Sequence, residues 1–448
     1  MNTNPAIRSP AVAGSFYPQV PAALRQQLLA LLGEAPAPDL PGLKVVLVPH
    51  AGYVYSGSTA ARLYASLISQ RQRIRRVILL GPAHRVALEG MAVPQATHWA
   101  SPLGISPVDR ELALKLQSAG LAVLDDAPHA AEHALEVQLP FLQTVLQPGT
   151  PILPVAVGRT APAQVAALLD ACWGDSETLI VLSTDLSHYL PYAQAGTMDQ
   201  ATVAQLLAFN AGLNGKQACG AFPLNGFLEV AVRRGLHSRL IDLRNSGDTA
   251  GSKDRVVGYA AIAYQDAQAA LGEVLLRIAR GIIEARFGAP APSVPDLPAL
   301  HETAACFVTL TKAGRLRGCI GSLQAHRRLV DDVIHNAQAA AFNDPRFPAL
   351  SAGELDTLRV EVSLLTPPEL MHFADEAEAL AVLRPGIDGV ILEEGRHRST
   401  YLPQVWEQLP TPAVFLSALK EKAGLPADYW SATLRLQRYA ALKWKEAM

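Results

Sequence analysis

The feature of this sequence that most constrains its fold is a regular alternation of short apolar runs with amphipathic segments in its first half. The apolar runs are strand-length and end in polar or glycine-bearing turns, at residues 45–48, 76–80, 151–157 and 179–182. Helical periodicity recurs between them, at residues 22–32, 59–67, 110–119, 163–172 and 202–209. Strands that alternate with helices predict an α/β unit with helices on both faces of a central sheet.

The second part of the chain has a different order of elements. A predicted strand at 256–264 closes the first unit, and a predicted helix at 268–287 follows it. Further strands are expected at residues 305–310, 358–365 and 389–392, separated by amphipathic helices at 329–341 and 412–423. This order predicts an α+β domain with a mainly antiparallel sheet. The length of 448 residues suits two or three domains, and we predict domains 1–266 and 267–448.

Composition excludes several classes of protein. The formal net charge is −2 and 17% of the residues are charged, so the chain lacks the basic patch typical of a nucleic-acid-binding protein. No apolar run is long enough to span a bilayer, and the first residues do not resemble a signal peptide. We therefore expect a cytoplasmic protein with no membrane and no nucleic-acid partner. Its four cysteines form no CxxC or CxxxCxxC cluster, which argues against a disulfide framework and against a bound Fe–S cluster.

Metal-capable side chains recur where the predicted strands end. His50, His84 and Asp185 each follow such a strand, and α/β sheets bind ligands outside the carboxyl ends of their strands. Imidazole and thiolate ligands suit iron, copper and zinc, whereas magnesium and calcium prefer oxygen. Each histidine alone is also compatible with an ordinary surface or core position, and Cys219 with a small buried apolar residue. The recurrence of histidine at successive strand ends is what favours a metal site.

Ordered words within residues 8–264 resemble the Memo family. They are Ala13-Gly-Ser-Phe-Tyr-Pro18, Pro49-His-Ala-Gly-Tyr53, Gly81-Pro-Ala-His84, Glu132-His133, Ser183-Thr-Asp-Leu-Ser-His188, Ala218-Cys-Gly220 and Val257-Gly-Tyr-Ala260. The fold of that family is similar to class III extradiol ring-cleaving dioxygenases. The resemblance implies that His50, His84 and Cys219 are metal ligands, and that Asp185 and His188 lie in the pocket.

The ring-cleaving enzymes bind Fe(II) with two histidines and a carboxylate, and here a cysteine takes the place of the carboxylate. The resemblance favours iron(II) as the cofactor, while a thiolate also tolerates copper or zinc. If a reaction occurs, His188 is the expected catalytic acid/base, and Asp185 could orient it. Helix N-capping is an alternative role for Asp185. For Glu132 and His133 we favour a place at a helix N-terminus or behind the ligands over direct ligation.

A second cysteine-containing word lies in the C-terminal part. Gly318 and Gly321 lie on either side of Cys319 at the end of an expected strand, and they permit close backbone approach. Arg315 and Arg317 could lower the pKa of the Cys319 thiol and make it a catalytic nucleophile. Alternatively, Cys319 packs in a sheet and the two arginines face solvent by alternation.

Residues 267–448 resemble the AMMECR1 family. The matching words are Leu316-Arg-Gly-Cys-Ile-Gly-Ser-Leu323, Phe342-Asn-Asp-Pro-Arg-Phe347, Leu383-Arg-Pro-Gly-Ile-Asp-Gly-Val390 and Tyr401-Leu-Pro-Gln-Val-Trp406. The fused arrangement is similar to proteins B and A of the AmmeMemoRadiSam system, in which a Memo-like, an AMMECR1-like and a radical-SAM protein occur together. The resemblance implies a radical-SAM partner on a separate chain.

Three functions remain open at this point. The first is a metal-dependent redox enzyme component, related to extradiol dioxygenases, that acts on a small molecule, with the second domain binding substrate or holding an intermediate at Cys319. The second is a metal-binding protein without turnover. The third is an interaction module whose C-terminal domain binds a peptide or partner. Fold similarity cannot choose among them, because function lies in the site.

Overall fold

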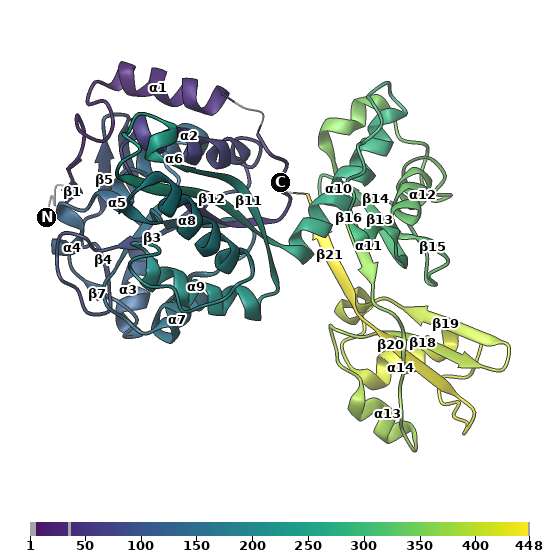
Figure 1. Ribbon diagram of the computed structural model, residues 1–448. Coiled ribbons are helices and arrows are strands. Elements are labelled where there is room, and N and C mark those ends of the chain that lie inside the picture. The colour runs from purple at the N-terminus through teal and green to yellow at the C-terminus, as the bar shows by residue number, and fades with distance from the viewer. Residues whose placement is uncertain (1–5, 35–36, 447–448) are drawn as a thin grey trace, which may run out of the picture. The chain divides into compact units, whose positions relative to one another are not determined.

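A computed structural model describes residues 6–34 and 37–446 of the chain (Figure 1). The described residues form two compact units, of which the first ends at Ala270 and the second begins at Leu271. Each unit has its own hydrophobic clusters and is described separately below.

The first unit is built on a mixed sheet whose central strands are parallel. In sheet order these central strands are β2 (Leu43–Val48), β9 (Thr178–Ser183), β3 (Arg76–Pro82) and β8 (Ile152–Val157). The flanking strands are β10 (His188–Leu190), β11 (Leu236–Asn245) and β12 (Val256–Asp266) on one side, and β4 (Met91–Val93) and β7 (Val123–Leu124) on the other. Every residue of β2, β8 and β9 is buried, which explains why these strands are nearly continuous apolar runs.

Helices cover both faces of this sheet, as predicted (Figure 1). One face packs against α1 (Pro21–Gly33), α2 (Tyr53–Tyr64) and α6 (Leu139–Val145), and the other against α3 (Arg110–Ser118), α7 (Pro162–Cys172), α8 (Tyr192–Leu207) and α9 (Ala221–Arg233). Alternate side chains of each central strand enter opposite cores: Val45 and Leu47 join one, and Val46 and Val48 the other.

The smaller elements of the first unit lie outside these layers. They are β1 (Ile7–Arg8), β5 (His98–Ser101) and β6 (Gly104–Pro107), which form a separate sheet, with α4 (Ala127–Ala130), α5 (His133–Glu136) and the 3-10 turns η1 (Ala65–Leu67) and η2 (Ser246–Asp248).

The second unit is an α+β structure, and its strands pair antiparallel, as predicted. One sheet contains β13 (Thr303–Lys312), β14 (Arg315–Gly321), β15 (Arg327–Arg328), β16 (Leu358–Leu365) and β21 (Ala441–Lys445), with α10 (Ala267–Ala285), α11 (Pro298–His301), α12 (Leu329–Phe342) and η3 (Ala352–Thr357). The other contains β17 (Glu369–Leu370), β18 (Gly389–Glu394), β19 (His397–Tyr401) and β20 (Arg435–Tyr439), with α13 (Glu376–Val382), α14 (Pro412–Lys422) and η4 (Pro403–Glu407). Among the described helices of both units, none has the length and apolar character needed to cross a bilayer.

Candidate metal centre

Three neighbouring parallel strands bring the polar words of the first unit to one edge of its sheet. β9 lies between β2 and β3, with Val48 beside Ser183 and Leu80 beside Leu182. The segments that follow these strands carry His50, Asp185 and His84, so residues far apart in the sequence lie at the same sheet edge.

Three imidazoles converge there. Ring nitrogens of His50, His84 and His133 all lie within 4.8 Å of one another, close enough to hold one metal ion. The His84 and His133 rings are stacked with their centroids 4.9 Å apart, and His50 meets both rings edge-on. The sequence favoured a place at a helix N-terminus or behind the ligands for His133. The residue is the first of α5 (His133–Glu136), and its ring lies within the cluster.

Hydrogen bonds fix which nitrogen each ring presents. The Ser183 hydroxyl donates to the Ala134 carbonyl oxygen, so at 3.0 Å it accepts from the Nδ1–H group of His50. Similarly, His84 Nδ1 donates to Glu132 Oε1 at 3.0 Å. The Nε2 atoms of both rings are thereby left unprotonated, and that of His50 faces the Cys219 thiol. Oxygen partners of this kind orient the histidine ligands of many metal sites.

Glu132 supports the cluster from the start of α5. Its carboxylate accepts from the backbone N–H groups of Ala134 and His84 as well as from the His84 ring. Burial alone would raise the pKa of Glu132, but these hydrogen bonds outweigh it and lower the pKa to about 2. The carboxylate is therefore ionised and acts as both helix cap and ring support.

Two of the imidazoles are neutral at pH 7. Burial, followed by repulsion from His84, lowers the pKa of His50 to about 3. Burial and repulsion from His50 lower the pKa of His133 to about 4. A neutral imidazole is the state in which histidine binds a metal.

The Cys219 thiol lies beside His50, in the segment before α9. Among the described residues, the mutually close group contains the three imidazoles and not this thiol. Its Sγ atom lies 3.3 Å from His50 Nε2 and 3.3 Å from the backbone nitrogen of Asp185. The next residue, Gly220, donates its N–H to Thr184 Oγ1 at 3.0 Å, and a Cβ there would lie only 2.8 Å from that oxygen. Burial, and then the nearby Asp185, raise the pKa of Cys219 to about 12.

Asp185 and His188 occupy different parts of this region. Asp185 is buried, and its Oδ1 accepts from the backbone N–H of His50 at 2.8 Å. Burial raises the pKa of Asp185. His188 begins β10 and is half-buried, and within the described ranges no hydrogen bond joins it to Asp185. Asp185 precedes a strand instead of a helix, so it orients the His50 backbone and does not act as a helix cap.

Cys319 lies in the second unit, in β14. Its thiol is half-buried and lies 3.3 Å from the Thr309 hydroxyl, while its backbone N–H donates to Asp344 and its carbonyl accepts from Arg346. The words Leu316–Leu323 and Phe342–Phe347 are therefore in direct contact. Arg317, one of the two arginines that could have acted on the thiol, pairs with Glu354.

Gly318, beside Cys319, permits the close backbone approach that was expected there. A Cβ at this position would lie 2.1 Å from the carbonyl oxygen of Ala340 in α12, so only glycine lets β14 lie this close to that helix.

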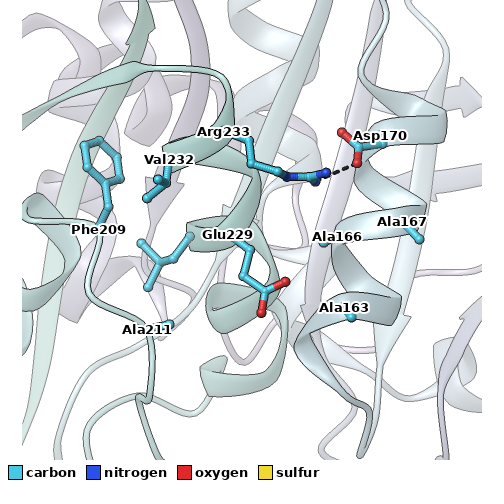
Figure 2. Close-up of a pocket in the computed structure, with 10 residues that line it drawn as sticks. Ala163, Ala166, Ala167, Asp170, Phe209, Ala211, Glu229, Val232 and Arg233 are labelled. Carbon is cyan, nitrogen blue, oxygen red and sulfur yellow. Dashed lines mark hydrogen bonds and ion pairs between the residues drawn. The ribbon is translucent and has the colours of Figure 1, made fainter.

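The cavities of the first unit include one away from the imidazoles. It measures about 580 Å³ and lies between α7 and α9, with the Asp170–Arg233 ion pair on its rim (Figure 2). Alanines and the side chains of Phe209 and Val232 make up most of its wall. It contains neither histidine nor cysteine among its lining residues, so it offers a surface for packing and no chemistry like that of the cluster.

Comparison with known proteins divides the chain as its two units do. The family described as Memo-like protein matches residues 8–263, and the AMMECR1 family matches residues 276–444. A MEMO1 family protein of Aquifex aeolicus is 34% identical over 264 residues, covering 56% of this chain and 97% of that protein. A second from Sulfolobus acidocaldarius is 32% identical over 284 residues, covering 58% and 100%. The crystal structure of an uncharacterized protein from Pyrococcus horikoshii is 36% identical and covers 39% of this chain and 91% of that one, with a TM-score of 0.36.

Proposed function

Because this chain belongs to the Memo family, and an AMMECR1 region follows its Memo region, we propose that it is the metal-binding component of a redox enzyme. It acts on a small molecule together with a radical-SAM protein on a separate chain. The observation that carries the proposal is the convergence of the His50, His84 and His133 imidazoles within 4.8 Å, with the Cys219 thiol 3.3 Å from His50.

The donor set fits a transition metal. Neutral imidazoles and a thiolate are ligands for iron, copper and zinc, so the Cys219 thiol would lose its proton on binding. The buried Nδ1 atom of His133 lies 3.3 Å from Glu132 but makes no hydrogen bond to any described residue. Buried polar nitrogens are rarely left without a partner, so this atom also favours a ligand at the cluster. We propose His50, His84 and Cys219 as the ligands, with His133 as a further candidate.

Each residue then has a defined task. Bound here, iron(II), which we favour, or copper would supply redox chemistry, and zinc would supply Lewis acidity. Glu132 and Ser183 keep the His84 and His50 rings aimed at the cluster. His188 is the group proposed to take up or give a proton at its ring nitrogen, because it is half-buried at the sheet edge near the cluster.

The partner and the second unit belong to the same proposal. The combination of Memo and AMMECR1 regions in one chain supports a shared reaction with a radical-SAM protein, and the sequence has no cysteine cluster that could hold the Fe–S group of such a protein. In the second unit, Cys319 is proposed as a nucleophile that holds an intermediate, because its thiol is half-buried and accessible. A cytoplasmic location stays a prediction from the sequence.

The deciding experiment is metal analysis of protein purified without oxygen. Wild type is compared with His50→Ala and Cys219→Ser, and with His237→Ala, an exposed histidine of β11 outside the cluster, as the matched control. We expect near-stoichiometric iron or copper in wild type and control, and its loss in both cluster variants. A wild type that binds no metal after anaerobic reconstitution contradicts the proposal and favours an interaction module. Tightly bound zinc in a site closed to added ligands favours metal binding without turnover.

A further inference from the structure

A strained tyrosine lies directly beside His188. In the pairing of β10 with β12, His188 is opposite Val257 and Leu190 is opposite Val256, so Tyr189 is an extra, bulged residue. Its φ angle is 58°, in the left-handed region that glycine adopts freely and a bulky residue rarely does. Bulges redirect side chains and occur often next to active sites. Here the bulge leaves the Tyr189 side chain exposed, with its ring 5.8 Å from that of His188.

An arginine without an acidic partner stacks on this tyrosine. The guanidinium carbon of Arg255 lies 5.1 Å from the centre of the Tyr189 ring. Arg255 is exposed, and within residues 6–34 and 37–446 it forms no ion pair. The neighbouring carboxylate, Asp254, accepts a hydrogen bond from Ser252. The Tyr189 ring thus holds a positive charge without an acidic partner, and the same ring lies 5.8 Å from that of His188.

A second cation of the same loop, Lys253, has a negative charge nearby. Lys253 stacks on Tyr192 with its nitrogen 4.8 Å from the ring centre. The Tyr192 hydroxyl, however, donates to the Asp248 carboxylate, so a negative charge accompanies this pair. Lys253 therefore provides a control for Arg255 that matches it in loop, stacking and sign of charge.

We propose that Arg255, held on Tyr189, binds the acidic group of the substrate, a carboxylate or a phosphate, as that substrate reaches the imidazole cluster. This inference rests on the proposed function for the cluster, but it concerns a different set of residues. A guanidinium pairs with either anion through two parallel hydrogen bonds, which fix orientation as well as position. Backbone strain at Tyr189, where glycine would be unstrained, indicates that its ring has a use.

The test measures anion binding and not activity. Fluorine NMR would follow 4-fluorobenzoate and 4-fluorophenyl phosphate, which distinguish the two acids, and the neutral 4-fluorobenzyl alcohol. Each probe is titrated into metal-free and into zinc-loaded full-length protein. We expect Arg255→Gln to weaken binding of the preferred acid by about tenfold or more, because a charged hydrogen-bond donor is lost. Lys253→Gln is expected to leave that affinity within about twofold of wild type.

Variants of Tyr189 separate binding from folding. Tyr189→Phe keeps the ring and is expected to bind like wild type. Tyr189→Gly removes the ring and relieves the left-handed backbone, so we expect weaker anion binding with a melting temperature at or above that of wild type.

The outcomes distinguish this inference from the metal proposal. Acid binding that depends on Arg255 in protein that takes up no metal would support the anion site and overturn the metal site. Metal uptake with equal affinity for the acid in wild type and Arg255→Gln would overturn the anion site alone. It would also be overturned if the neutral alcohol bound as tightly as both acids, or if Lys253→Gln weakened binding as much as Arg255→Gln.

Discussion

Oε1 of Glu132 lies 3.0 Å from Nδ1 of His84, and the same carboxylate accepts a hydrogen bond from the backbone N–H of His84. One buried side chain therefore fixes both the ring and the main chain of a proposed ligand. Glu132 Oε1 also lies 3.3 Å from His133 Nδ1, but without a hydrogen bond, so among the three imidazoles its hydrogen bond goes to His84.

Replacement of Glu132 by glutamine is expected to weaken metal binding without unfolding the protein. The amide keeps the size of the side chain but offers a single acceptor oxygen to the groups that the carboxylate now satisfies. Loss of such a supporting partner costs about 10–100-fold in metal affinity. Competition with a chromophoric chelator measures the change. Glu89→Gln, which affects an exposed ion pair with Arg159, is the control, and equal affinities in the two variants would contradict the role given to Glu132.

Limiting iodoacetamide is expected to alkylate Cys319 before the other cysteines. Cys172 and Cys306 are buried, and burial raises the pKa of both thiols, as it does for Cys219. Added zinc should slow labelling of Cys219 and leave Cys319 unchanged. Mass spectrometry of the peptides gives the order. Cys219 would not be the ligand if zinc slowed labelling of Cys319, or if zinc left labelling of Cys219 unchanged.

The buried ion pair between Arg8 and Glu136 is expected to be essential for stability. Glu136 also accepts from Tyr17 and from the backbone N–H groups of Ala11 and Val12, so it ties the first described residues to α5. Arg8→Met leaves this carboxylate buried without its cation, and we expect a loss of about 3–5 kcal/mol in the free energy of unfolding of the first unit. Urea unfolding measures it. Arg25→Met, at an exposed position of α1, should stay within about 0.5 kcal/mol of wild type.

The second unit is expected to lose stability in acid partly through Asp344. The Arg346 guanidinium, with the backbone N–H groups of Cys319 and Arg346, holds the pKa of this buried carboxyl below its usual range. Because the folded pKa is the lower one, the stabilisation is complete above the unfolded value of about 3.9 and is lost as pH falls through the folded value. Asp344→Asn should therefore unfold with a weaker dependence on pH below about pH 4. Parallel pH profiles for the two proteins would refute this assignment.

The fold could be predicted largely because its strands are so deeply buried. Residues 45–48 were expected as a strand, and β2 extends over Leu43–Val48 with every side chain buried. The helix expected at 202–209 begins earlier, at Tyr192. Its first turns consist mostly of small and polar residues without an apolar period, so periodicity did not predict this start. α2 begins at Tyr53, six residues before the expected start, where Ser56 and Gly57 are weak helix formers.

The positions of site residues that do not follow a strand were harder to predict from the sequence. His50 and His84 follow strands, and their positions could be predicted from the order of the elements. His133 belongs to the short helix α5, and its place depends on a packing contact, since a Cβ on Gly81 would lie 2.9 Å from Leu135. The adjacent Glu132-His133 pair was the available signal. The Cys319–Asp344 hydrogen bond similarly joins two sequence motifs, and their spacing along the chain did not indicate that they are in contact.

Asp185 links His50 and Cys219 through its side chain and its backbone. Its carboxylate binds the His50 backbone, its N–H points at the Cys219 sulfur and its carbonyl accepts from the Cys219 N–H. One residue thereby couples two proposed ligands that are 169 positions apart in the sequence. If these residues bind a metal as proposed, the hydrogen bonds already hold the donors in place, so little conformational entropy would be lost on binding. The rate of metal exchange would then depend on the loss of water from the ion and on deprotonation of the Cys219 thiol. The protein would have the same conformation with and without the metal.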